Sequence, residues 1–393
     1  MATVLFGWEL GGGLGHIVPL VRIAEALAHD GHQPVFVVKD LSIATKHLSE
    51  HHPDHDWPVL QPPLWPKVAS RDAFVATGYA DVLGRIGYLD ETLLATSLSA
   101  WLDLIREIEP ALVVTNYAPT LNLAAWETAS QVIIGTGFTV PPAHKPTFVT
   151  YRGTSSPSQV NQDEMLACVQ NAREQLCLSP LSCLTDFQSA PQSFALTLRA
   201  LDPHRDSRLI PAIGLMDDPV ELSTKPDDSK FYAYLDGRDS AAVELLAALA
   251  RAGIAGNVHL KFASPEQEQR LMQLGLQMEP NPINFRERMN EFALVIHHGG
   301  NATAASALLA GRPQVLLPRF LEQDLTGDAL AELGVGVSLK GTLHVADLIA
   351  TVQSLMSDTD RISHMHSVAS QIRQRESFDA LKRIVDHCRG ELS

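Results

Sequence analysis

The sequence has 393 residues, of which 45% are hydrophobic, and a formal net charge of −15 at pH 7. A chain of this length is expected to form two or three domains, each with its own core. The acidic excess disfavours general electrostatic binding of nucleic acid, because a negative surface repels phosphate backbones. An aromatic content of 6% with ordinary glycine and proline counts excludes disordered and collagen-like classes.

No segment has the features of a targeting or membrane sequence. The start, MATVLFGWELGGG, lacks the basic stretch and cleavage site of a signal peptide, and no apolar run approaches the ~18 residues of a membrane helix. The four cysteines form no CxxC pair, so we expect reduced thiols buried as fillers and no metal. These features predict a cytoplasmic protein without integral membrane association, nucleic-acid partner or cofactor.

The first forty residues predict a strand, a glycine-rich loop, a helix and a second strand. The apolar run 2–8 suits a buried parallel strand, and the four glycines of ELGGGLGH interrupt it. Apolar residues then recur with helical spacing over 20–27, before the strand at 34–38. A doubly wound α/β domain begins in this order.

The rest of the chain repeats this α/β pattern in two series. The first continues with a helix at 98–108, strand 111–115, helix 121–129, strand 132–137, an irregular part at 141–193 with a helix near 161–176, and strand 194–198. The second has strands at 230–235, 257–262, 292–298 and 314–318, and helices at 241–252, from 303, and at 324–333, 343–356 and 361–388. The Pro- and Asp-rich stretch between them predicts an N-terminal domain over 1–201, a linker over 202–228 and a C-terminal domain over 229–370.

The C-terminal series contains a candidate phosphate-binding turn. VIHHGGNAT (295–303) places a strand end, two glycines and a hydroxyl at the start of a helix. Glycines let a ligand approach the backbone, and the first N–H groups of a helix attract anions. The alternative is a tight turn that needs glycine, with His298 merely packed.

The segment 296–336, IHHGGNATAASALLAGRPQVLLPRFLEQDLTGDALAELGVG, resembles the C-terminal signature of nucleotide-sugar-dependent glycosyltransferases of the GT-B fold. These include UDP-glycosyltransferases and bacterial macrolide and antibiotic glycosyltransferases, whose signature reads H-G-G-x-[GN]-[ST]…G-x-P…P…[DE]-Q…G-x-G. GGGLGHIVPL is similar to the family's N-terminal loop, GxxGHxxP. The resemblance implies two Rossmann-like doubly wound parallel-sheet domains facing a cleft, with the last helix, about 371–393, packing back on the N-terminal domain.

The resemblance also implies roles for individual residues. His16 would be the general base that deprotonates the acceptor, which suits its near-neutral ordinary pKa. The alternative is that His16 only caps its helix or binds a phosphate. The diphosphate, sugar and nucleobase of the donor would be met by Gly13, Gly15, Pro282, Ile283, His298, Gly299, Gly300, Asn301, Ala302, Thr303, Glu322 and Gln323.

Several positions depart from the family pattern. Ser306 stands where relatives often have an acid that grips the ribose hydroxyls, which favours a deoxyribose nucleotide such as dTDP over UDP. Asn116 stands where several relatives have an aspartate that orients the histidine, and an amide cannot stabilise imidazolium with a charge. Glu9 is a candidate substitute for that aspartate. Ala302 replaces a residue that is usually glycine or asparagine.

Two other patterns invite alternative interpretations. HHPDHD (51–56) has metal-ligand residue types, but its proline-broken spacing favours a solvated loop. Gly11 and Gly13 fit a dinucleotide motif with Asp40 as its acid, but His16 occupies the place of the third glycine, where a bulky residue spoils helix packing.

The sequence therefore predicts an inverting, metal-independent glycosyltransferase of the hexosyltransferase type. It would move a sugar from a UDP- or dTDP-sugar to a hydroxyl or other nucleophile of a small-molecule acceptor, with His16 and Asn116 as catalytic residues. One alternative is a catalytically silent protein that assists an active transferase. Another is a sugar-nucleotide epimerase, which needs several acids and bases around the sugar, where only Glu322 is evident.

Overall fold

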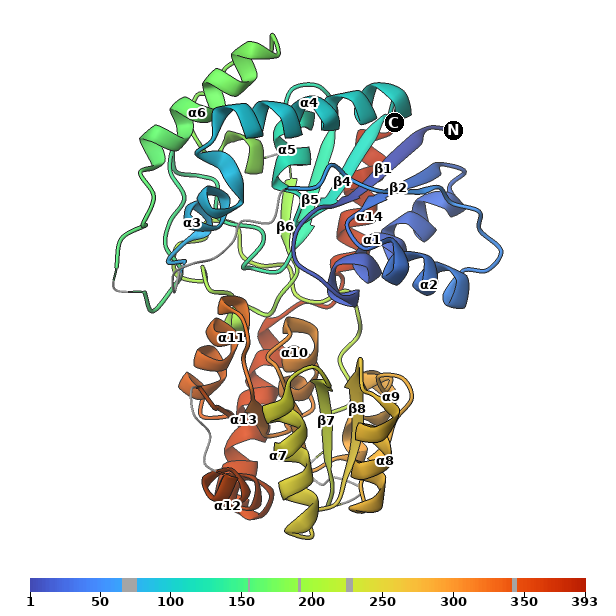
Figure 1. Ribbon diagram of the computed structural model, residues 1–393, viewed down its shortest axis with the longest axis vertical. Helices are drawn as coiled ribbons and strands as arrows, with labels where there is room; N and C mark the ends of the chain where they lie inside the picture. The colour runs from blue at the N-terminus through green and yellow to red at the C-terminus, as the bar shows by residue number, and fades with distance from the viewer. Residues whose placement is uncertain (66–75, 155, 190–191, 224–228, 341–344) are drawn as a thin grey trace. The chain divides into compact units, whose positions relative to one another are not determined.

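The computed structural model describes residues 1–65, 76–154, 156–189, 192–223, 229–340 and 345–393. The chain divides into two compact units (Figure 1): the N unit, Met1–Asp217 with Asp379–Ser393, and the C unit, Asp218–Phe378. The predicted linker at 202–228 is too long, because 202–217 pack within the N unit, where Ile213 is buried in the core. Its part at 224–228 lies outside the described residues.

The N unit is built on a six-stranded parallel sheet. Its strand order is β3-β2-β1-β4-β5-β6. The strands are β1 (Thr3–Trp8), β2 (Gln33–Val38), β3 (Val59–Leu60), β4 (Leu112–Asn116), β5 (Gln131–Gly135) and β6 (Gln192–Ala195). The central strands β1, β4 and β5 are almost wholly buried, which matches their continuous apolar sequences.

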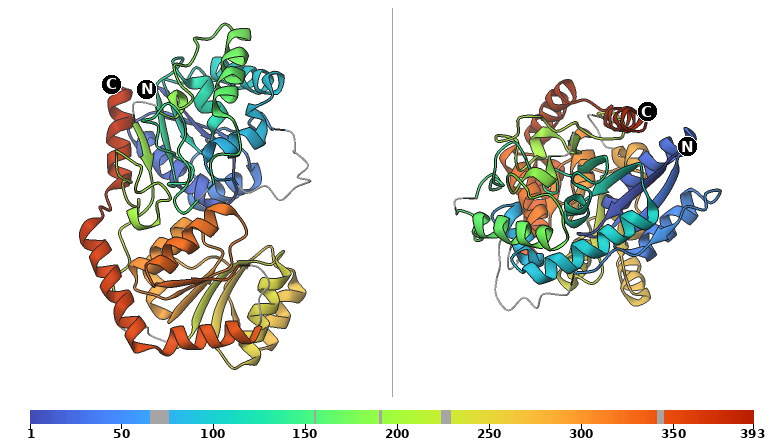
Figure 2. Two further views of the ribbon diagram at one scale, coloured as in Figure 1. Left: turned by 90° about the vertical axis from the view of Figure 1, so that its left-hand side faces the viewer. Right: turned by 90° about the horizontal axis from the view of Figure 1, so that it is seen from above.

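Helices cover both faces of this sheet (Figures 1 and 2). They are α1 (Leu14–His29), α2 (Leu41–His51), α3 (Tyr79–Leu83), α4 (Glu91–Ile108), α5 (Pro119–Ala125), α6 (Gln162–Gln175) and α14 (Ala380–Glu391), with short helical turns η1 (Gly84–Tyr88), η2 (Asp186–Gln188) and η3 (Arg199–Leu201). The buried face of α1 carries Leu20, Ile23 and Leu27, as the helical spacing predicts.

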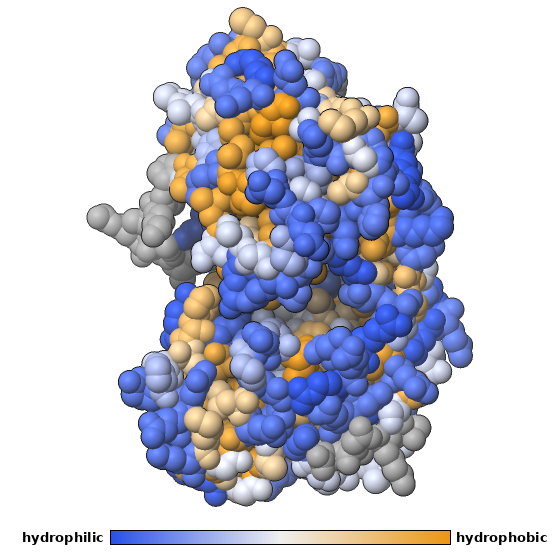
Figure 3. Space-filling model, turned by 90° about the vertical axis from the view of Figure 1, so that its right-hand side faces the viewer, coloured by the Kyte–Doolittle hydropathy of each residue, from blue (hydrophilic) through white to orange (hydrophobic). Residues whose placement is uncertain are grey.

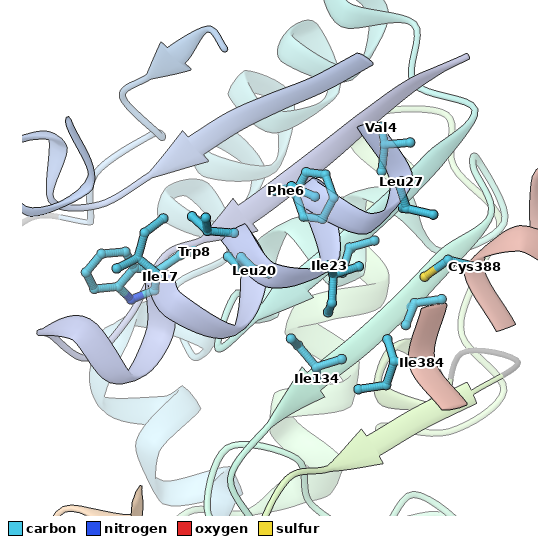
Figure 4. Close-up of a cluster of buried hydrophobic side chains, with 14 of the residues drawn as sticks. Val4, Phe6, Trp8, Ile17, Leu20, Ile23, Leu27, Ile134, Ile384 and Cys388 are labelled. Atoms are coloured by element: carbon cyan, nitrogen blue, oxygen red, sulfur yellow. The ribbon is translucent and has the colours of Figure 1, made fainter. Parts of the chain in front are cut away.

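The C-terminal helix α14 completes the core of the N unit. Ile384 and Cys388 of α14 are fully buried in the cluster that also contains Ile23 of α1 and Ile134 of β5 (Figure 4). Helix α14 therefore packs within the N unit although it lies at the far end of the sequence.

The C unit repeats the same topology. Its sheet has the order β12-β11-β10-β7-β8-β9, all parallel. The strands are β7 (Phe231–Asp236), β8 (Gly256–Lys261), β9 (Gln277–Met278), β10 (Leu294–His297), β11 (Gln314–Leu316) and β12 (Gly336–Ser338). The helices are α7 (Ser240–Arg251), α8 (Pro265–Gln273), α9 (Phe285–Arg288), α10 (Asn301–Leu309), α11 (Leu321–Glu332), α12 (Val345–Ser357) and α13 (Thr359–Arg375), with a turn η4 (Met289–Glu291).

Two units with one topology confirm the predicted pair of Rossmann-like doubly wound sheets. The chain order of strands in each sheet is 3-2-1-4-5-6, the order of nucleotide-binding folds. In such sheets ligands bind beyond the carboxyl ends of the strands, where the order reverses. This point lies between β1 and β4 in the N unit and between β7 and β10 in the C unit.

Two predictions about the chain's end and its thiols are wrong. The single helix expected at 361–388 is two helices, because the backbone is extended at Glu376 and the chain passes from one unit to the other there. Residues 371–375 therefore stay in the C unit, as the end of α13. Of the four cysteines only Cys388 is buried, and Cys177 is exposed.

One face of the molecule is largely polar. Hydrophilic residues cover most of the face shown in Figure 3, with hydrophobic residues interspersed. Within the described part of the chain, no helix combines the length and apolar character needed to cross a membrane.

Candidate functional site

The carboxyl end of the N-unit sheet holds a histidine fixed by an asparagine. Trp8 ends β1, Asn116 ends β4, and the two pair across the sheet. His16 lies in the first turn of α1, whose preceding residue, Gly13, has a positive φ of 91° that suits glycine. The Nδ1 atom of His16 is 2.9 Å from Oδ1 of Asn116. Two residues that are one hundred positions apart in the sequence thus meet at the point where the strand order reverses.

Two aromatic rings stack on the imidazole of His16. The ring of Trp8 stacks on it with centroids 5.3 Å apart, and Tyr117 stacks with centroids 5.9 Å apart. A Cβ atom at Gly11 would collide with Nε2 of His16, so only glycine leaves space beside this nitrogen. Because Asn116 accepts from Nδ1–H, Nε2 carries the lone pair and can accept a proton.

The surroundings of His16 keep it neutral. Burial lowers the pKa of His16, and the positive charge of Lys39 lowers it further, while the bond to Asn116 opposes both effects. The proposed substitute, Glu9, does not orient the histidine. Its buried carboxylate accepts from the indole of Trp65 at 2.6 Å and from the backbone N–H of Thr120 at 2.8 Å, and burial raises its pKa.

The C-unit turn has the geometry that the sequence predicts. Strand β10 ends at His297, and α10 starts at Asn301 after two glycines. Gly299 has a φ of 100°, and a Cβ atom there would lie 2.9 Å from the backbone oxygen of Gln323. Gly300 is the N-cap of α10 and has no side-chain cap bond from the described residues. The first-turn N–H groups point out of the start of the helix, which lies at the carboxyl end of the sheet.

The side chain of Thr303 lies in this first turn and is 6% exposed. Its neighbour Ala302 is exposed, and Asn301 is half-buried. In the N unit, Gly13 and Gly15 stand at the start of α1 beside His16.

The structure assigns His298 a different set of contacts from the predicted one. Its Nδ1 donates to the backbone oxygen of Leu317 at 2.7 Å, and its Nε2 accepts from the backbone N–H of Asp236 at 3.0 Å. Neither nitrogen has a hydrogen left for a phosphate in this arrangement. His298 therefore holds the glycine turn against β7 and β11, and its direct contact with a diphosphate stays a prediction.

His297 is a structural residue that the sequence analysis did not use. Its ring is buried, donates to Oε1 of Gln314 at 2.9 Å, and accepts from the backbone N–H of Gly299 at 3.0 Å. Burial lowers the pKa of His297 to about 4. The two adjacent histidines thus tie the turn to its surroundings, His297 through Gln314 and His298 through Leu317 and Asp236.

Of the predicted sugar-binding and base-binding residues, Gln323 lies against the turn, since its backbone oxygen would be 2.9 Å from a Cβ atom at Gly299. Glu322 and Gln323 are in the first turn of α11, and Oε1 of Gln323 accepts from the backbone N–H of Arg319 at 2.8 Å. Ile283 is 7% exposed and packs in a cluster with Tyr232 and with Ala307 of α10, so its side chain belongs to the core. Pro282, beside it, is half-buried.

Sequence reasoning missed an arginine pair beside the turn. Arg238 and Arg319 both bond the carboxylate of Asp236, at 2.7 Å each. These arginines hold the pKa of Asp236 well below its ordinary value. Arg238 also lies over the ring of Phe262, 4.0 Å from its centroid. The signal that could have found Asp236 and Arg238 is the DGR sequence at the end of β7, because charged residues at the end of a central strand lie at the ligand-binding edge.

The alternative sites lack this organisation. In the HHPDHD segment His51 ends α2 and His55 stacks on Trp57, and within the described residues no three His, Cys, Asp or Glu side chains gather as metal ligands would. Asp40, the acid of the dinucleotide interpretation, caps α2 by accepting from the backbone N–H of Ile43.

Comparison with known proteins identifies glycosyltransferases to which parts of this chain are similar. Residues 282–379 match the family described as erythromycin biosynthesis protein CIII-like, C-terminal domain. The chain is 32% identical over 104 residues to the vancomycin aglycone glucosyltransferase of Amycolatopsis orientalis, a match that covers 26% of each chain. It is 31% identical over 118 residues to the NDP-glycosyltransferase YjiC of Bacillus subtilis (strain 168), covering 26% of this chain and 30% of that protein. The resemblance to antibiotic GT-B glycosyltransferases is confirmed. The matched part of the chain spans less than a third of the length of these curated relatives.

Solved structures extend the similarity over the whole chain. The calicheamicin glycosyltransferase CalG4 superposes with a TM-score of 0.65 at 18% identity, covering 100% of this chain and 98% of that one. The glycosyltransferase VinC, solved in complex with dTDP, gives a TM-score of 0.64 at 13% identity, covering 98% of this chain and 100% of that one. These matches show that the chain has the GT-B fold.

Proposed function

We propose that the protein is an inverting glycosyltransferase. It transfers a sugar from a UDP- or dTDP-sugar to a hydroxyl or other nucleophile of a small-molecule acceptor, without a metal ion. The observation that carries this proposal is the imidazole of His16, which Asn116 orients and two aromatic rings hold, in a chain of the GT-B fold. The dTDP complex of VinC supports a thymidine diphosphate donor.

The N unit would supply the base. As the acceptor oxygen attacks the anomeric carbon, Nε2 of His16 takes the acceptor proton. The new bond forms on the face opposite the leaving group, so the configuration at that carbon inverts. The diphosphate leaves with the electron pair of the bond that breaks.

The C unit would stabilise the leaving diphosphate. The N–H groups at the start of α10 and the positive end of that helix favour negative charge, and the two arginines on Asp236 add cationic donors nearby. Glu322 and Gln323 would meet sugar hydroxyls. This arrangement supplies positive charge from the protein itself, which supports transfer without a metal.

A nucleotide screen with a transfer assay tests the proposal. A ligand that binds only the native state raises the melting temperature, so dTDP or UDP and their glucose conjugates should raise Tm by several degrees, while inorganic phosphate at the same concentration should not. Transfer to an aromatic acceptor should survive EDTA, and the product should have the opposite anomeric configuration to the donor. A Tm shift without transfer or donor hydrolysis would instead support the silent auxiliary protein. No shift with any nucleotide would refute both.

A further inference from the structure

The residue that orients His16 limits which acceptors this site can activate. A general base that removes a proton becomes positively charged, and in Ser-His-Asp sites a buried aspartate stabilises that imidazolium. Here the partner is Asn116, whose amide oxygen lies 2.9 Å from Nδ1 and whose side chain carries no charge. Asn116 orients the ring and fixes its tautomer, but it stabilises imidazolium only through a neutral dipole.

The other charged groups around the imidazole of His16 do not replace the missing negative charge. Lys39 follows β2, and its positive charge disfavours imidazolium. The carboxylate of Glu9 bonds Trp65 and Thr120, and that of Asp40 caps α2. Farther along α1, Arg22 pairs with Asp217. Trp8 and Tyr117 stack on the imidazole and bring no charge to it.

A comparison between protease sites shows what such a base can do. Papain-like enzymes pair histidine with asparagine and use an acidic thiol as the nucleophile, whereas replacing the aspartate of a serine protease by asparagine lowers kcat by ~10⁴, largely through the wrong histidine tautomer. In papain-like sites, an asparagine-supported histidine thus serves a nucleophile that ionises easily. A phenol has a pKa of about 10, against about 16 for water and similar hydroxyls.

We propose that this protein glycosylates acceptors with an acidic hydroxyl, of which a phenol is the simplest, in preference to aliphatic alcohols. The inference rests on the proposed function and narrows the class of acceptor molecules that the protein would use. In the step, a bond forms between the phenolic oxygen and the anomeric carbon, while the bond from that carbon to the diphosphate breaks and the diphosphate keeps the electron pair. The phenolic proton passes to Nε2 of His16 and then to solvent.

The first test compares two acceptors with the same ring system, 2-naphthol and 2-naphthalenemethanol, with dTDP-glucose or UDP-glucose as donor. Wild-type kcat/KM should favour the naphthol by at least ~100-fold. Asn116→Asp supplies the missing charge, so it should raise kcat/KM for the alcohol at least ~10-fold and raise the alcohol-to-naphthol ratio of kcat/KM at least ~3-fold. Asn171→Asp adds the same charge on exposed α6 and should change neither.

The second test does not depend on any acceptor. In protein with ¹³C-labelled histidine, the His16 signal, assigned by its loss in His16→Gln, should titrate below the ordinary histidine range, because burial and the charge of Lys39 lower the pKa of His16. In Asn116→Asp its titration should move upward by at least one pH unit. Equal use of both naphthyl acceptors would overturn the inference, as would an equal effect of Asn116→Asp on both. A wild-type His16 that titrates at or above the ordinary histidine pKa of about 6.5 would also overturn it. Absence of any transfer or nucleotide binding would instead refute the proposed function, while the titration would still decide whether His16 lacks a charged partner.

Discussion

Arg319 donates to the carboxylate of Asp236 at 2.7 Å, although the two residues are eighty-three positions apart in the sequence. Arg238 bonds both oxygens of the same carboxylate. Two positive side chains therefore share one negative partner at the end of β7, and the cluster keeps a net positive charge. The same Asp236 donates its backbone N–H to His298, so the cluster is tied to the glycine turn.

This cluster predicts the effect of removing one arginine. Arg319→Ala should weaken dTDP binding by about tenfold, because it removes a charge-assisted hydrogen bond to a phosphate. A tenfold change in Kd corresponds to about 1.4 kcal/mol of binding free energy. Isothermal titration calorimetry measures the change. Arg270→Ala is the matched control, since Arg270 pairs with Glu244 on the exposed surface of the same unit. Equal affinities of Arg319→Ala and wild type would remove Arg319 from the donor site.

Replacing His16 by alanine should separate catalysis from donor binding. We expect transfer to fall by ~10²–10⁴-fold, because general base catalysis contributes that much, while the Kd for dTDP stays within twofold of wild type. His29→Ala, at the exposed last turn of the same helix, should leave turnover unchanged. Normal turnover in His16→Ala would show that another group is the base.

The two adjacent glycines of the turn should respond differently to alanine. Gly299→Ala puts a methyl group against the backbone of Gln323 at a positive φ, so we expect a loss of about 1–3 kcal/mol in the stability of the C unit. Gly300 has ordinary backbone angles and open space around its Cα, so Gly300→Ala should keep the Tm. If a diphosphate sits on the first turn of α10, Gly300→Ala should still bind dTDP more weakly. Circular dichroism melts and dTDP titrations measure both effects, and equal Tm losses in the two variants would contradict the strain at Gly299.

A buried histidine should make the N unit sensitive to acid. His204 is 1% exposed beside Tyr151, and burial lowers its pKa to about 4. The unfolded chain has a histidine pKa of about 6.5, so it takes up the proton first as the pH falls, and stability present above pH 6.5 is lost progressively toward pH 4. Between pH 7.5 and 5.0 this histidine should cost ~2 kcal/mol of unfolding free energy.

Urea unfolding at the two pH values measures this loss. All five tryptophans of the chain lie in the N unit, so their fluorescence follows that unit alone. His204→Phe should lose about 2 kcal/mol less than wild type between pH 7.5 and 5.0. His144→Gln, at an exposed position, should behave as wild type. An unchanged pH dependence in His204→Phe would show that other groups cause the acid sensitivity.

The sequence predicted the elements that have strong local patterns. The run 2–8 with its glycine loop and α1 was identified because a buried parallel strand, a glycine turn and helical spacing each have a distinct pattern. The short edge strands β3, β9 and β12 were missed because two or three residues carry no measurable periodicity. Helix α14 was merged with α13 because the break at Glu376 lacks glycine and proline.

The candidate site could be predicted where the family resemblance indicated which residues meet. It could not be predicted where contacts between residues far apart in the sequence determine what a side chain does. The meeting of His16 with Asn116 follows from the strand order, which the family implied. One of the two hydrogen bonds of His298 comes from the backbone of Asp236, which is sixty-two positions away. No local sequence pattern predicts this bond. The role suggested for Glu9 failed for the same reason, because its partners Trp65 and Thr120 are distant in sequence.

The return of α14 to the N unit makes the C unit an insertion within the N unit. The N unit lacks a side of its core until residues 380–391 have been synthesised, so on the ribosome it can reach its final packing only after the whole C unit has emerged. The C unit, in contrast, is one continuous stretch, and its residues are available together earlier. A stop codon just before α14 would thus damage the part of the protein that was made first and spare the part next to the cut.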